Sequence, residues 1–391
     1  MSMAVEAPAT EADLAALIAG STAPLAIEGN GTKRAMLRPV QAARTLSTRA
    51  LSGITLYRPE ELILSARAGT PLPEITAALA ERGQMLVAES PSLGALYGAT
   101  LPPTLGGLVG ANLSGPRRIS AGAMRDHVMG IRAVNGAGEV FRSGGRVLKN
   151  VTGLDLCKLL TGAHGTLGVI TEVTLKVLPR PPASATLALR VATLEAGVAV
   201  LSAGLGSPYG VSGAALLPRG LAAGEGPVAV LRIEDFPASV DYRCGKLAAE
   251  LAPLGEALRL DQPASEALWQ DIAELAPLGA APEHAVWRVS VAPSRGPGVV
   301  AAAGMPKALL DWGGGLVWLA GPATTATHAA VVAAALQAGG AFTLMRAPQP
   351  LRAAVAVLPE EPAALAAIGA RVKAVMDPRG LLNPGRMRAG A

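Results

Sequence analysis

The chain has 391 residues, of which 50% are hydrophobic and 16% are charged, with 46 glycines and 31 prolines. This apolar share excludes a disordered chain, and the length predicts two or three domains with a sizeable core. The formal net charge of +5 lies entirely in residues 1–180, which hold 18 Lys and Arg against 13 Asp and Glu.

The composition also excludes several kinds of site. Cys157 and Cys244 are too few for a disulfide framework, a zinc cage or a four-thiolate iron–sulfur cluster, so any iron–sulfur electron path must lie on another chain. No apolar run approaches the roughly 18 residues that span a bilayer. Because the N-terminus carries Glu6, Glu11 and Asp13 in place of a basic leader, we expect a cytoplasmic protein.

The first predicted elements alternate between helix and strand. A capped amphipathic helix runs from Thr10 to Gly20, and a short strand follows over Leu25–Glu28. A second strand begins at Ile63. Thr70 is then expected to N-cap a helix that has Pro71 at its first position and Gly83 just past its end.

Further strands are predicted over 130–134, 139–142 and 169–177, the last with nine residues of apolar and polar alternation. The Pro-rich run 179–182 is a good domain boundary. Beyond it, strands at 228–233, 285–291 and 315–319 alternate with helices and indicate an α+β domain, and a C-terminal helix spans 362–376.

A first glycine cluster, Gly29-Asn30-Gly31-Thr32-Lys33, follows the strand at 25–28. Glycines allow backbone N–H groups to approach phosphate oxygens, so this loop is a candidate pyrophosphate cradle. It lacks the third glycine of a dinucleotide fingerprint and the Lys-Ser/Thr order of a P-loop. A plain turn therefore remains the alternative.

Two more glycine clusters lie in the same half of the chain, over Thr104–Pro116 and Gly162–Ile170. Their small residues offer little to pack, so we expect the first to lie against a flat ligand with its backbone amides pointing inward. The second is a turn that feeds the strong strand at 169–177. A large anionic cofactor is the simplest explanation of all three clusters.

The positive charge is densest between residues 115 and 149. Only Asp126 and Glu139 oppose seven cations there, which are Arg117, Arg118, Arg125, Arg132, Arg142, Arg146 and Lys149. Such a field suits an anionic ligand or an acidic partner, although an ordinary charged surface is the alternative. Motifs and aromatics for reading nucleic acid are missing, so we expect no nucleic acid partner.

Several stretches resemble the vanillyl-alcohol-oxidase type of FAD-linked oxidases. They are Arg67–Leu72, Thr104–Pro116, Arg125–Gly130, Lys149–Leu156, Gly165–Ile170 and Asp377–Arg386. Within this family, the runs at 113–118 and 147–151 are especially similar to the FAD-binding E subunits of three-subunit bacterial glycolate oxidases. The resemblance covers nearly all of 25–180 and returns near 311, 345 and the C-terminus, whereas about 185–300 are weakly matched.

The resemblance implies an α+β fold in three parts. Residues 1–180 would form a PCMH-type FAD-binding domain of two α+β subdomains, 181–360 an α+β cap domain, and 361–391 a helix and tail that return to the FAD domain. The implied cofactor-binding residues are Gly29, Asn30, Gly31, Thr32, Lys33, Thr104, Leu105, Gly106, Gly107, Ala111, Asn112, Ser114, Gly115, Gly122, Asp126, His127, Gly165, Thr166, Gly168, Val169, Ile170 and Asn383.

Each cluster has an implied role. Residues 29–33 would hold the pyrophosphate, 104–114 with 126–127 would line the flavin, and 165–170 would flank the adenine or ribityl side. Family members with covalent FAD carry a His in the first glycine loop or a Cys further on. Thr32 and Lys33 stand in this loop, so the resemblance implies non-covalent FAD.

Family members that oxidise 2-hydroxy acids by themselves usually carry a His-x-Gly-Asp-Gly-x-x-His stretch that helps to hold a metal and the substrate. None of the four histidines lies in such a stretch, so no metal is implied. Hydride removal needs a base and cations for the carboxylate. Arg288 or Arg346 and His284 or His328 are candidates, but a surface or structural role suits each as well, and we assign no catalytic residue.

The leading hypothesis is an FAD-binding subunit of a heteromeric glycolate oxidase that supports or relays electrons. Its partners would be a homologous FAD-binding catalytic subunit and an iron–sulfur subunit, its substrate a small 2-hydroxy acid, and any membrane contact would run through partners. The alternatives are a self-sufficient FAD dehydrogenase of a small hydroxy acid such as D-lactate, and a scaffold that has lost FAD.

Overall fold

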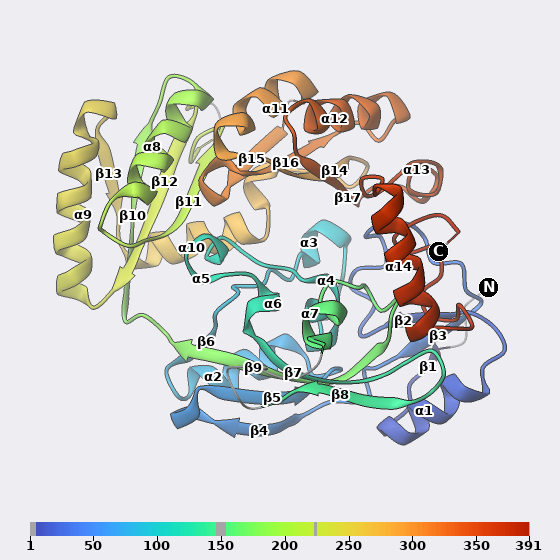
Figure 1. The fold of residues 1–391 in the computed structure, drawn as a ribbon. Coiled ribbons are helices and arrows are strands. Elements are labelled where there is room, and N and C mark those ends of the chain that lie inside the picture. The colour runs from blue at the N-terminus through green and yellow to red at the C-terminus, as the bar shows by residue number, and fades with distance from the viewer. Residues whose placement is uncertain (1–4, 146–153, 223–224, 306, 391) are drawn as a thin grey trace. The chain divides into compact units, whose positions relative to one another are not determined.

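The computed structural model describes residues 5–145, 154–222, 225–305 and 307–390 (Figure 1). The chain forms two compact units. The first comprises Met1–Ser114, Gly122–Arg180 and Glu360–Ala391, and the second Gly115–Ala121 and Pro181–Pro359. The larger segment of the second unit begins at Pro181. The segment 115–121, which the sequence assigns to the first domain, belongs to the second unit.

The first unit contains two sheets. In the smaller one, β3 (Arg44–Ser47) lies between β1 (Val5–Glu6) and β2 (Leu25–Glu28), and both pairings are parallel. The larger sheet has the antiparallel order β4-β5-β9-β7-β8, with β6 paired to the far end of β9. Its strands are β4 (Ile54–Arg58), β5 (Ile63–Arg67), β6 (Gln84–Leu86), β7 (Val128–Val134), β8 (Val140–Gly144) and β9 (Val169–Pro179).

Strand β9 is the central element of the larger sheet. Its predicted alternation is confirmed from Val173 onward, where Val173, Leu175 and Val177 are buried and the residues between them are half-buried. Burying an aliphatic side chain of this size contributes about 1.5–3 kcal/mol relative to leaving it exposed. The alternation therefore fixes which face of the sheet covers the core.

The helices of the first unit are mostly short. They are α1 (Glu11–Gly20), α2 (Leu72–Ala80), α3 (Gly94–Tyr97), α4 (Leu105–Ala111), α6 (Met124–His127), α7 (Leu156–Leu160) and α14 (Ala363–Met376). Helix α1 begins as expected, because the Thr10 hydroxyl accepts a hydrogen bond from the Asp13 N–H at 3.1 Å. Its buried residues Leu14 and Ile18 pack against Leu25 and Leu46 of the smaller sheet.

The predicted N-cap of α2 is wrong. Pro71 occupies that position and the helix has no side-chain cap. The Thr70 hydroxyl instead donates to the Arg67 carbonyl at 2.7 Å and accepts from the Gly53 N–H at 3.0 Å. It closes the turn that follows β5, and a buried hydroxyl used in this way is not available to the helix.

The C-terminal tail returns to the first unit, as expected. The Asp377 carboxylate ends α14 by accepting hydrogen bonds from the Leu381 and Leu382 N–H groups at 3.0 and 2.8 Å. The tail then pairs with β2, where the Leu25 N–H donates to the Leu381 carbonyl and the Asn383 N–H donates to the Leu25 carbonyl. The tail therefore lies alongside β2, at the edge of the smaller sheet.

The second unit is built on one antiparallel sheet with the order β13-β10-β12-β11-β15-β16-β14-β17. Its strands are β10 (Ala183–Arg190), β11 (Val211–Leu217), β12 (Val228–Asp235), β13 (Ala257–Leu260), β14 (Ala285–Ser290), β15 (Lys307–Asp311), β16 (Leu316–Gly321) and β17 (Ala341–Arg346). The three strands predicted here correspond to β12, β14 and β16.

Helices alternate with these strands along the chain, as the α+β prediction required. They are α8 (Leu194–Gly206), α9 (Pro237–Leu251), α10 (Gln262–Ala273), α11 (Gly296–Ala303), α12 (Thr325–Gln337) and α13 (Gln349–Ala354), while α5 (Arg118–Ala121) lies in the segment 115–121. No helix in the described ranges is long and apolar enough to cross a membrane.

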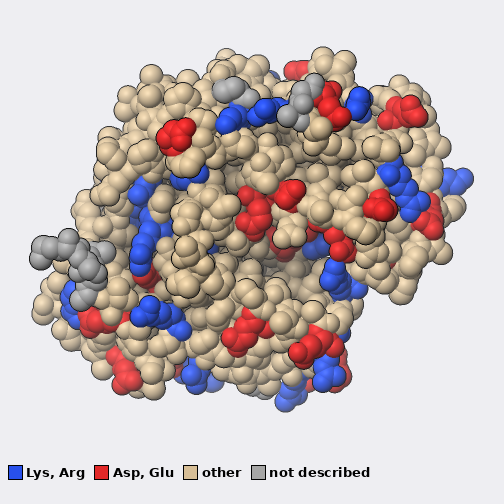
Figure 2. Space-filling model, turned by 180° about the vertical axis from the view of Figure 1, so that it is seen from behind, with Lys and Arg blue, Asp and Glu red and all other residues tan. Residues whose placement is uncertain are grey.

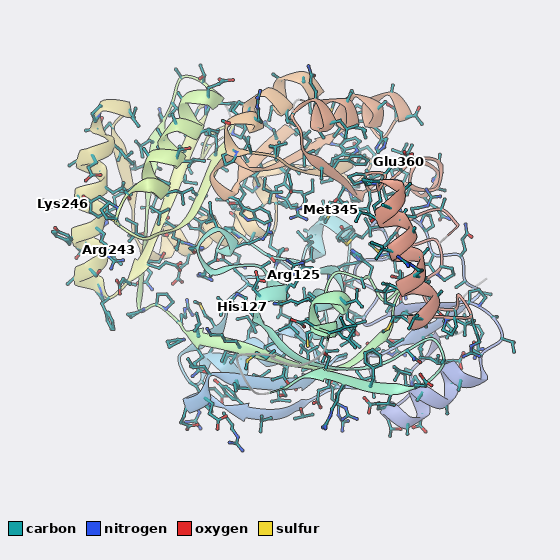
Figure 3. The ribbon with its side chains drawn as sticks, in the orientation of Figure 1. Arg125, His127, Arg243, Lys246, Met345 and Glu360 are labelled. Carbon is teal, nitrogen blue, oxygen red and sulfur yellow. The ribbon has the colours of Figure 1, made fainter. Side chains whose placement is uncertain are left out.

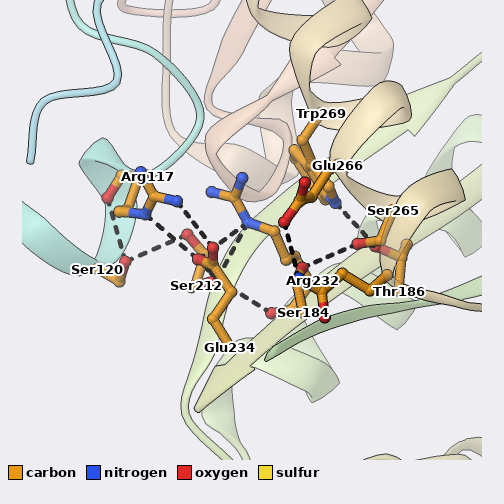
Figure 4. Close-up of polar contacts among 11 residues, drawn as sticks. Arg117, Ser120, Ser184, Thr186, Ser212, Arg232, Glu234, Ser265, Glu266 and Trp269 are labelled. Carbon is orange, nitrogen blue, oxygen red and sulfur yellow. Dashed lines mark hydrogen bonds and ion pairs between the residues drawn. The ribbon is translucent and has the colours of Figure 1, made fainter. Parts of the chain in front are cut away.

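A buried polar network attaches the segment 115–121 to the second unit (Figure 4). Arg117 Nη2 lies 2.8 Å from Glu234 Oε1, and Arg232 Nε lies 3.2 Å from Glu234 Oε2. The Ser212 hydroxyl donates to the same carboxylate at 2.6 Å, and Ser120 donates to the Ser212 carbonyl at 3.2 Å. Because of these contacts, the segment 115–121 packs with the second unit and not with the first domain, to which the sequence assigns it.

Replacing Glu234 with Gln is expected to lower the free energy of unfolding by about 3 kcal/mol at pH 7, because two largely buried guanidiniums lose their shared anion. Glu225→Gln, whose partner Arg190 is 72% exposed, should lower it by about 1 kcal/mol or less. Urea denaturation of both variants and the parent measures the difference. Equal losses in the two variants would contradict this account of the network.

The same network predicts a pH dependence. Burial opposes ionisation of Glu234, but Arg232, Arg117 and Ser212 outweigh it and lower the pKa of this carboxyl below its ordinary value of 4.5. Its contribution is therefore present above that value and is lost as the pH falls through the lowered pKa. Between pH 5 and pH 3 the parent should lose more stability than Glu234→Gln, as followed by thermal unfolding in the two proteins.

Candidate functional site

The three glycine clusters, far apart in the sequence, lie together in the first unit. A Cβ atom built on Gly29 would lie only 2.1 Å from Thr104 Oγ1, so the first loop touches the start of the second cluster. The Gly110 carbonyl accepts the His164 N–H at 2.8 Å, and the Val109 carbonyl accepts the Gly162 N–H at 3.1 Å. Side chains larger than hydrogen are thus excluded at the first of these contacts.

The first loop follows β2 directly. Gly31 has φ +68°, a left-handed conformation that favours glycine. The Asn30 amide donates to the Pro102 carbonyl at 2.9 Å, which ties the loop to the chain just before Thr104. Lys33 Nζ donates to the Thr32 hydroxyl at 3.2 Å. The predicted residues therefore form one compact turn against the second cluster.

The second cluster contains a short helix, α4, whose first amides bond within the protein and are not available to a ligand. The Leu105 and Gly106 N–H groups donate to the carbonyls of Thr70 and Ala68, and the Gly107 N–H donates to the Thr104 hydroxyl that caps the helix. Gly106 is needed for packing, because its Cβ would lie 2.7 Å from Ala68 Cβ. The sequence concealed this because glycine-rich stretches are poor helix formers.

One face of α4 is nevertheless open. Gly110 is buried, yet a Cβ atom built on it would meet no heavy atom within 4 Å outside its own helix and neighbours. Leu105, Leu108 and Val109 fill the opposite side of the helix with buried side chains. The position of Gly110 therefore borders space that the protein itself leaves unfilled.

The third cluster is held by the C-terminal tail. The Asn383 amide donates to the His164 carbonyl at 2.8 Å, and its oxygen accepts the Ile27 N–H at 2.7 Å. A Cβ on Gly165 would lie 2.9 Å from Asn383 Nδ2. The Thr166 hydroxyl donates to the Ala163 carbonyl at 2.7 Å. The remaining predicted residues lie in or beside β9, with Gly168 just before the strand and Val169 and Ile170 buried at its start.

The chain between Ala111 and His127 is shaped by side chains that cap its turns. The Asn112 amide oxygen accepts the Arg125 N–H at 3.2 Å, and the Ser114 hydroxyl accepts the Met124 N–H at 2.9 Å. Asp126 accepts the Ala123 N–H at 2.9 Å, and its carboxylate lies close beside Gly122. Figure 3 labels Arg125 and His127 on the short helix α6.

Gly115 belongs to a different compact unit from the other predicted cofactor residues. It belongs to the second unit, where its carbonyl accepts the Trp312 Nε1–H at 3.1 Å. The rest of the predicted set lies in the first unit. The sequence placed Gly115 with Ser114 only because the two are adjacent in the chain.

Basic groups surround the first and third clusters. The Arg386 guanidinium donates to the Lys33 carbonyl at 2.7 Å and to the Arg34 carbonyl at 3.2 Å. Desolvation, together with the charge of Arg386, lowers the pKa of His164 from 6.5 to about 3. The positive charge of Arg386 beside the first and third clusters favours an anionic ligand there.

Among the described arginines of the run 115–149, two are engaged in ion pairs. Arg117 is paired with Glu234 and Arg132 is paired with Glu11, whereas Arg146 and Lys149 lie outside the described residues. Figure 2 shows Lys and Arg interspersed with Asp and Glu on the face it presents. The cations closest to the glycine clusters include Lys33 and Arg386, which lie outside that run.

Most of the candidate catalytic residues of the second unit have structural partners. Arg346 donates to the His284 carbonyl at 2.9 Å, and His284 Nδ1 accepts the Ala281 N–H at 3.3 Å. His328 Nδ1 accepts the Trp287 Nε1–H at 3.1 Å, and burial lowers the pKa of this histidine. Neither histidine is thereby placed as a catalytic base, and Arg288 is considered separately below.

The geometry of the first unit therefore fits a large, flat, anionic group. It offers a buried glycine with open space beside it, a loop of small residues at a strand end, and a desolvated histidine beside Arg386. In the described part of the chain, no group of three or more His, Cys, Asp or Glu could hold a metal ion.

Comparisons with known proteins agree with this geometry. Residues 3–144 match the family described as FAD binding domain. The chain is 37% identical over 368 residues to the glycolate oxidase subunit GlcE of Escherichia coli (strain K12), which covers 94% of this chain and 93% of that protein. It is 36% identical over 99 residues to the glycolate oxidase subunit GlcD of Bacillus subtilis (strain 168), covering 25% and 21% of the two chains.

A solved structure of alkyldihydroxyacetonephosphate synthase has the same fold. It superimposes with a TM-score of 0.70 over 97% of this chain and 76% of that chain, at 16% sequence identity. At this identity the likeness concerns the fold alone.

Replacing Asn383 with Ala is expected to lower the free energy of unfolding by about 2–3 kcal/mol, because the Ile27 N–H and the His164 carbonyl lose a buried partner. The residue also has φ +46°, which disfavours alanine. Asn30→Ala, which removes one hydrogen bond at a half-buried site, should cost about 1 kcal/mol. Urea unfolding compares the two variants, and an Asn383→Ala protein as stable as the parent would contradict the role given to this residue.

Proposed function

The chain belongs to the family of the glycolate oxidase subunit GlcE, and from this premise we propose that it is the FAD-binding subunit of a heteromeric 2-hydroxy acid oxidoreductase that converts glycolate to glyoxylate. Its FAD binding domain makes FAD its cofactor. The observation that carries the proposal is the open face of Gly110, in the helix α4 that contacts the first loop at Thr104 and the third cluster at Val109 and Gly110.

The residues of the first unit divide the work of holding FAD. The Gly29–Lys33 loop receives the pyrophosphate, with Arg386 supplying charge through its position beside Lys33. Residues 104–114 with Asp126 and His127 line the flavin, and 165–170 flank the adenine or ribityl side. Thr32 and Lys33 stand where covalent family members carry a linking side chain, so FAD is held without a covalent bond. Bound FAD supplies a two-electron acceptor.

The role in the complex is support or electron relay, and the hydride step belongs to another subunit. The hydrogen bonds of His284 and His328 within the second unit support this, because neither histidine is placed as a catalytic base. The sequence lacks the four thiolates of a simple iron–sulfur cluster, so an iron–sulfur electron path requires a partner chain. The proposed partners are a homologous FAD-binding catalytic subunit and an iron–sulfur subunit, in a cytoplasmic assembly that meets a membrane only through partners.

The cofactor site is tested by Gly110→Ala. The added methyl group meets no protein atom and improves helix propensity by roughly 0.5–1 kcal/mol, so the FAD-free protein should be at least as stable as the parent. If FAD occupies the space beside Gly110, the methyl group displaces it and the affinity falls tenfold or more. Titration of FAD into the apoprotein, followed by flavin fluorescence, measures the change.

Gly20→Ala is the matched control for this test. Gly20 ends α1, and a Cβ there also meets no heavy atom within 4 Å. FAD affinity should be unchanged in this variant. If Gly110→Ala binds FAD with the affinity of the parent, FAD does not occupy the space beside Gly110 and the proposed site is wrong.

The division of labour is tested by anaerobic mixing with glycolate. The isolated, FAD-loaded chain should keep its flavin absorbance, whereas the complex co-expressed with its partner subunits should lose it. Rapid bleaching of the isolated chain by glycolate or D-lactate would instead support the second candidate, a self-sufficient dehydrogenase. Absence of any co-purifying flavin or iron–sulfur subunit would contradict the heteromeric assembly.

A further inference from the structure

Two arginines lie against one aromatic ring in the second unit. The guanidinium carbon of Arg118 lies 4.1 Å from the centroid of the Trp312 ring, and that of Arg288 lies 5.1 Å from the same centroid. Both distances are within the range of cation–π contact. Arg118, Arg288 and Trp312, which we call the arginine–tryptophan cluster, come from three separate segments of this unit.

The ring of Trp312 is fixed in place by hydrogen bonds. Trp312 lies in the turn between β15 and β16 with φ +53°, a left-handed conformation that is uncommon for a bulky residue. Its N–H donates to the Asp311 carboxylate at 2.7 Å, and its Nε1–H donates to the Gly115 carbonyl at 3.1 Å. Strained conformations of this kind are retained where the surroundings hold them in place.

The hydrogen bond from Trp312 to Gly115 also holds the segment that carries Arg118 close to the ring. Gly115 and Arg118 share the segment 115–121, which the buried ion pair between Arg117 and Glu234 attaches to the sheet. Arg118 follows Ser114, a residue proposed to line the flavin, by four positions in the chain. The cluster is therefore built by the segment that leads from the proposed cofactor site.

Arg288 differs from the other inward-facing arginines of this unit. Arg346 and Arg352 donate to backbone carbonyls, and Arg232 is bonded to Glu234. In the ranges that the structure describes, Arg288 forms no ion pair or hydrogen bond through its side chain. Its known contact is the ring of Trp312.

The electrostatics of Arg288 are correspondingly unfavourable. Burial, and then the like charge of Arg118, lower the pKa of Arg288 from 12.5 to about 10. No carboxylate contributes to this balance. Two partly desolvated cations on one ring repel each other, and an anion between or beside them would relieve the repulsion.

We propose that Arg288 and Arg118 bind the carboxylate of a small 2-hydroxy or 2-oxo acid, with the ring of Trp312 as one wall of the site. The planar fork of a guanidinium matches a carboxylate with two parallel hydrogen bonds. The choice of a small organic acid over other anions rests on the proposed function, in which the substrate and the product of the whole complex both carry a carboxylate. This chain would bind such an acid without carrying out the hydride step.

The test uses oxalate, which has two carboxylates and no hydroxyl carbon to oxidise. Oxalate is titrated into the FAD-loaded full chain while tryptophan fluorescence and the thermal midpoint are followed, with chloride at matched ionic strength as the blank. Arg288→Gln should raise the dissociation constant at least tenfold, and Arg288→Lys should raise it less. Trp312→Phe should remove the fluorescence change but keep the thermal shift.

Arg190→Gln is the matched control, because Arg190 is an exposed arginine of the same unit that pairs with Glu225. It should bind oxalate like the parent. Arg288→Gln should be at least as stable as the parent without oxalate, since it removes a like-charge repulsion. A marked fall in its thermal midpoint would show that Arg288 has a structural role and would overturn the proposal.

Two other results would also overturn it. One is parent-like oxalate binding by Arg288→Gln, and the other is inorganic phosphate competing with oxalate at equal concentration. The flavin spectrum keeps this inference separate from the proposed function. If the chain binds no flavin but binds oxalate in a way that depends on Arg288, the oxalate site is upheld and the proposed function is contradicted. If the chain binds flavin but not oxalate, the proposed function stands and the oxalate site is contradicted.

Discussion

The side chain of Asn383 holds together two segments that precede it in the chain by 356 and 219 residues. Its oxygen accepts the N–H of Ile27 on β2, and its amide group donates to the carbonyl of His164 in the third glycine cluster. A single buried residue, 3% exposed, therefore fixes the first loop relative to the third. The return of the tail to the first unit places this side chain beside Ile27 and His164, and Arg386 beside Lys33.

The site so formed combines close backbone approach with positive charge. Gly29 and Gly165 allow neighbouring segments to meet at distances that a Cβ would forbid, while Gly110 leaves space that no side chain fills. His164 remains neutral because it is desolvated beside Arg386. In the second unit, Arg288 is likewise buried beside a second cation, Arg118.

Much of the fold could be predicted from local patterns. The cap at Thr10, the alternation along β9 and the C-terminal helix are short-range signals, and each corresponds to an element of the structure. The glycine clusters also marked the loops that meet. Their conformation could not be predicted, because the amides of Leu105 and Gly106 are taken by the carbonyls of Thr70 and Ala68, a pairing between segments that no periodicity reveals. The ion pair of Arg117 with Glu234 is equally remote, which is why segment 115–121 was placed in the wrong unit.

The central claim is that the converging clusters hold FAD non-covalently, and the most direct measurement is the flavin content of the purified full chain. The account predicts about one FAD per chain after reconstitution, with all of the yellow colour released into the supernatant when acid precipitates the protein. A chain that takes up no FAD, or one that keeps its flavin in the acid pellet, would contradict it.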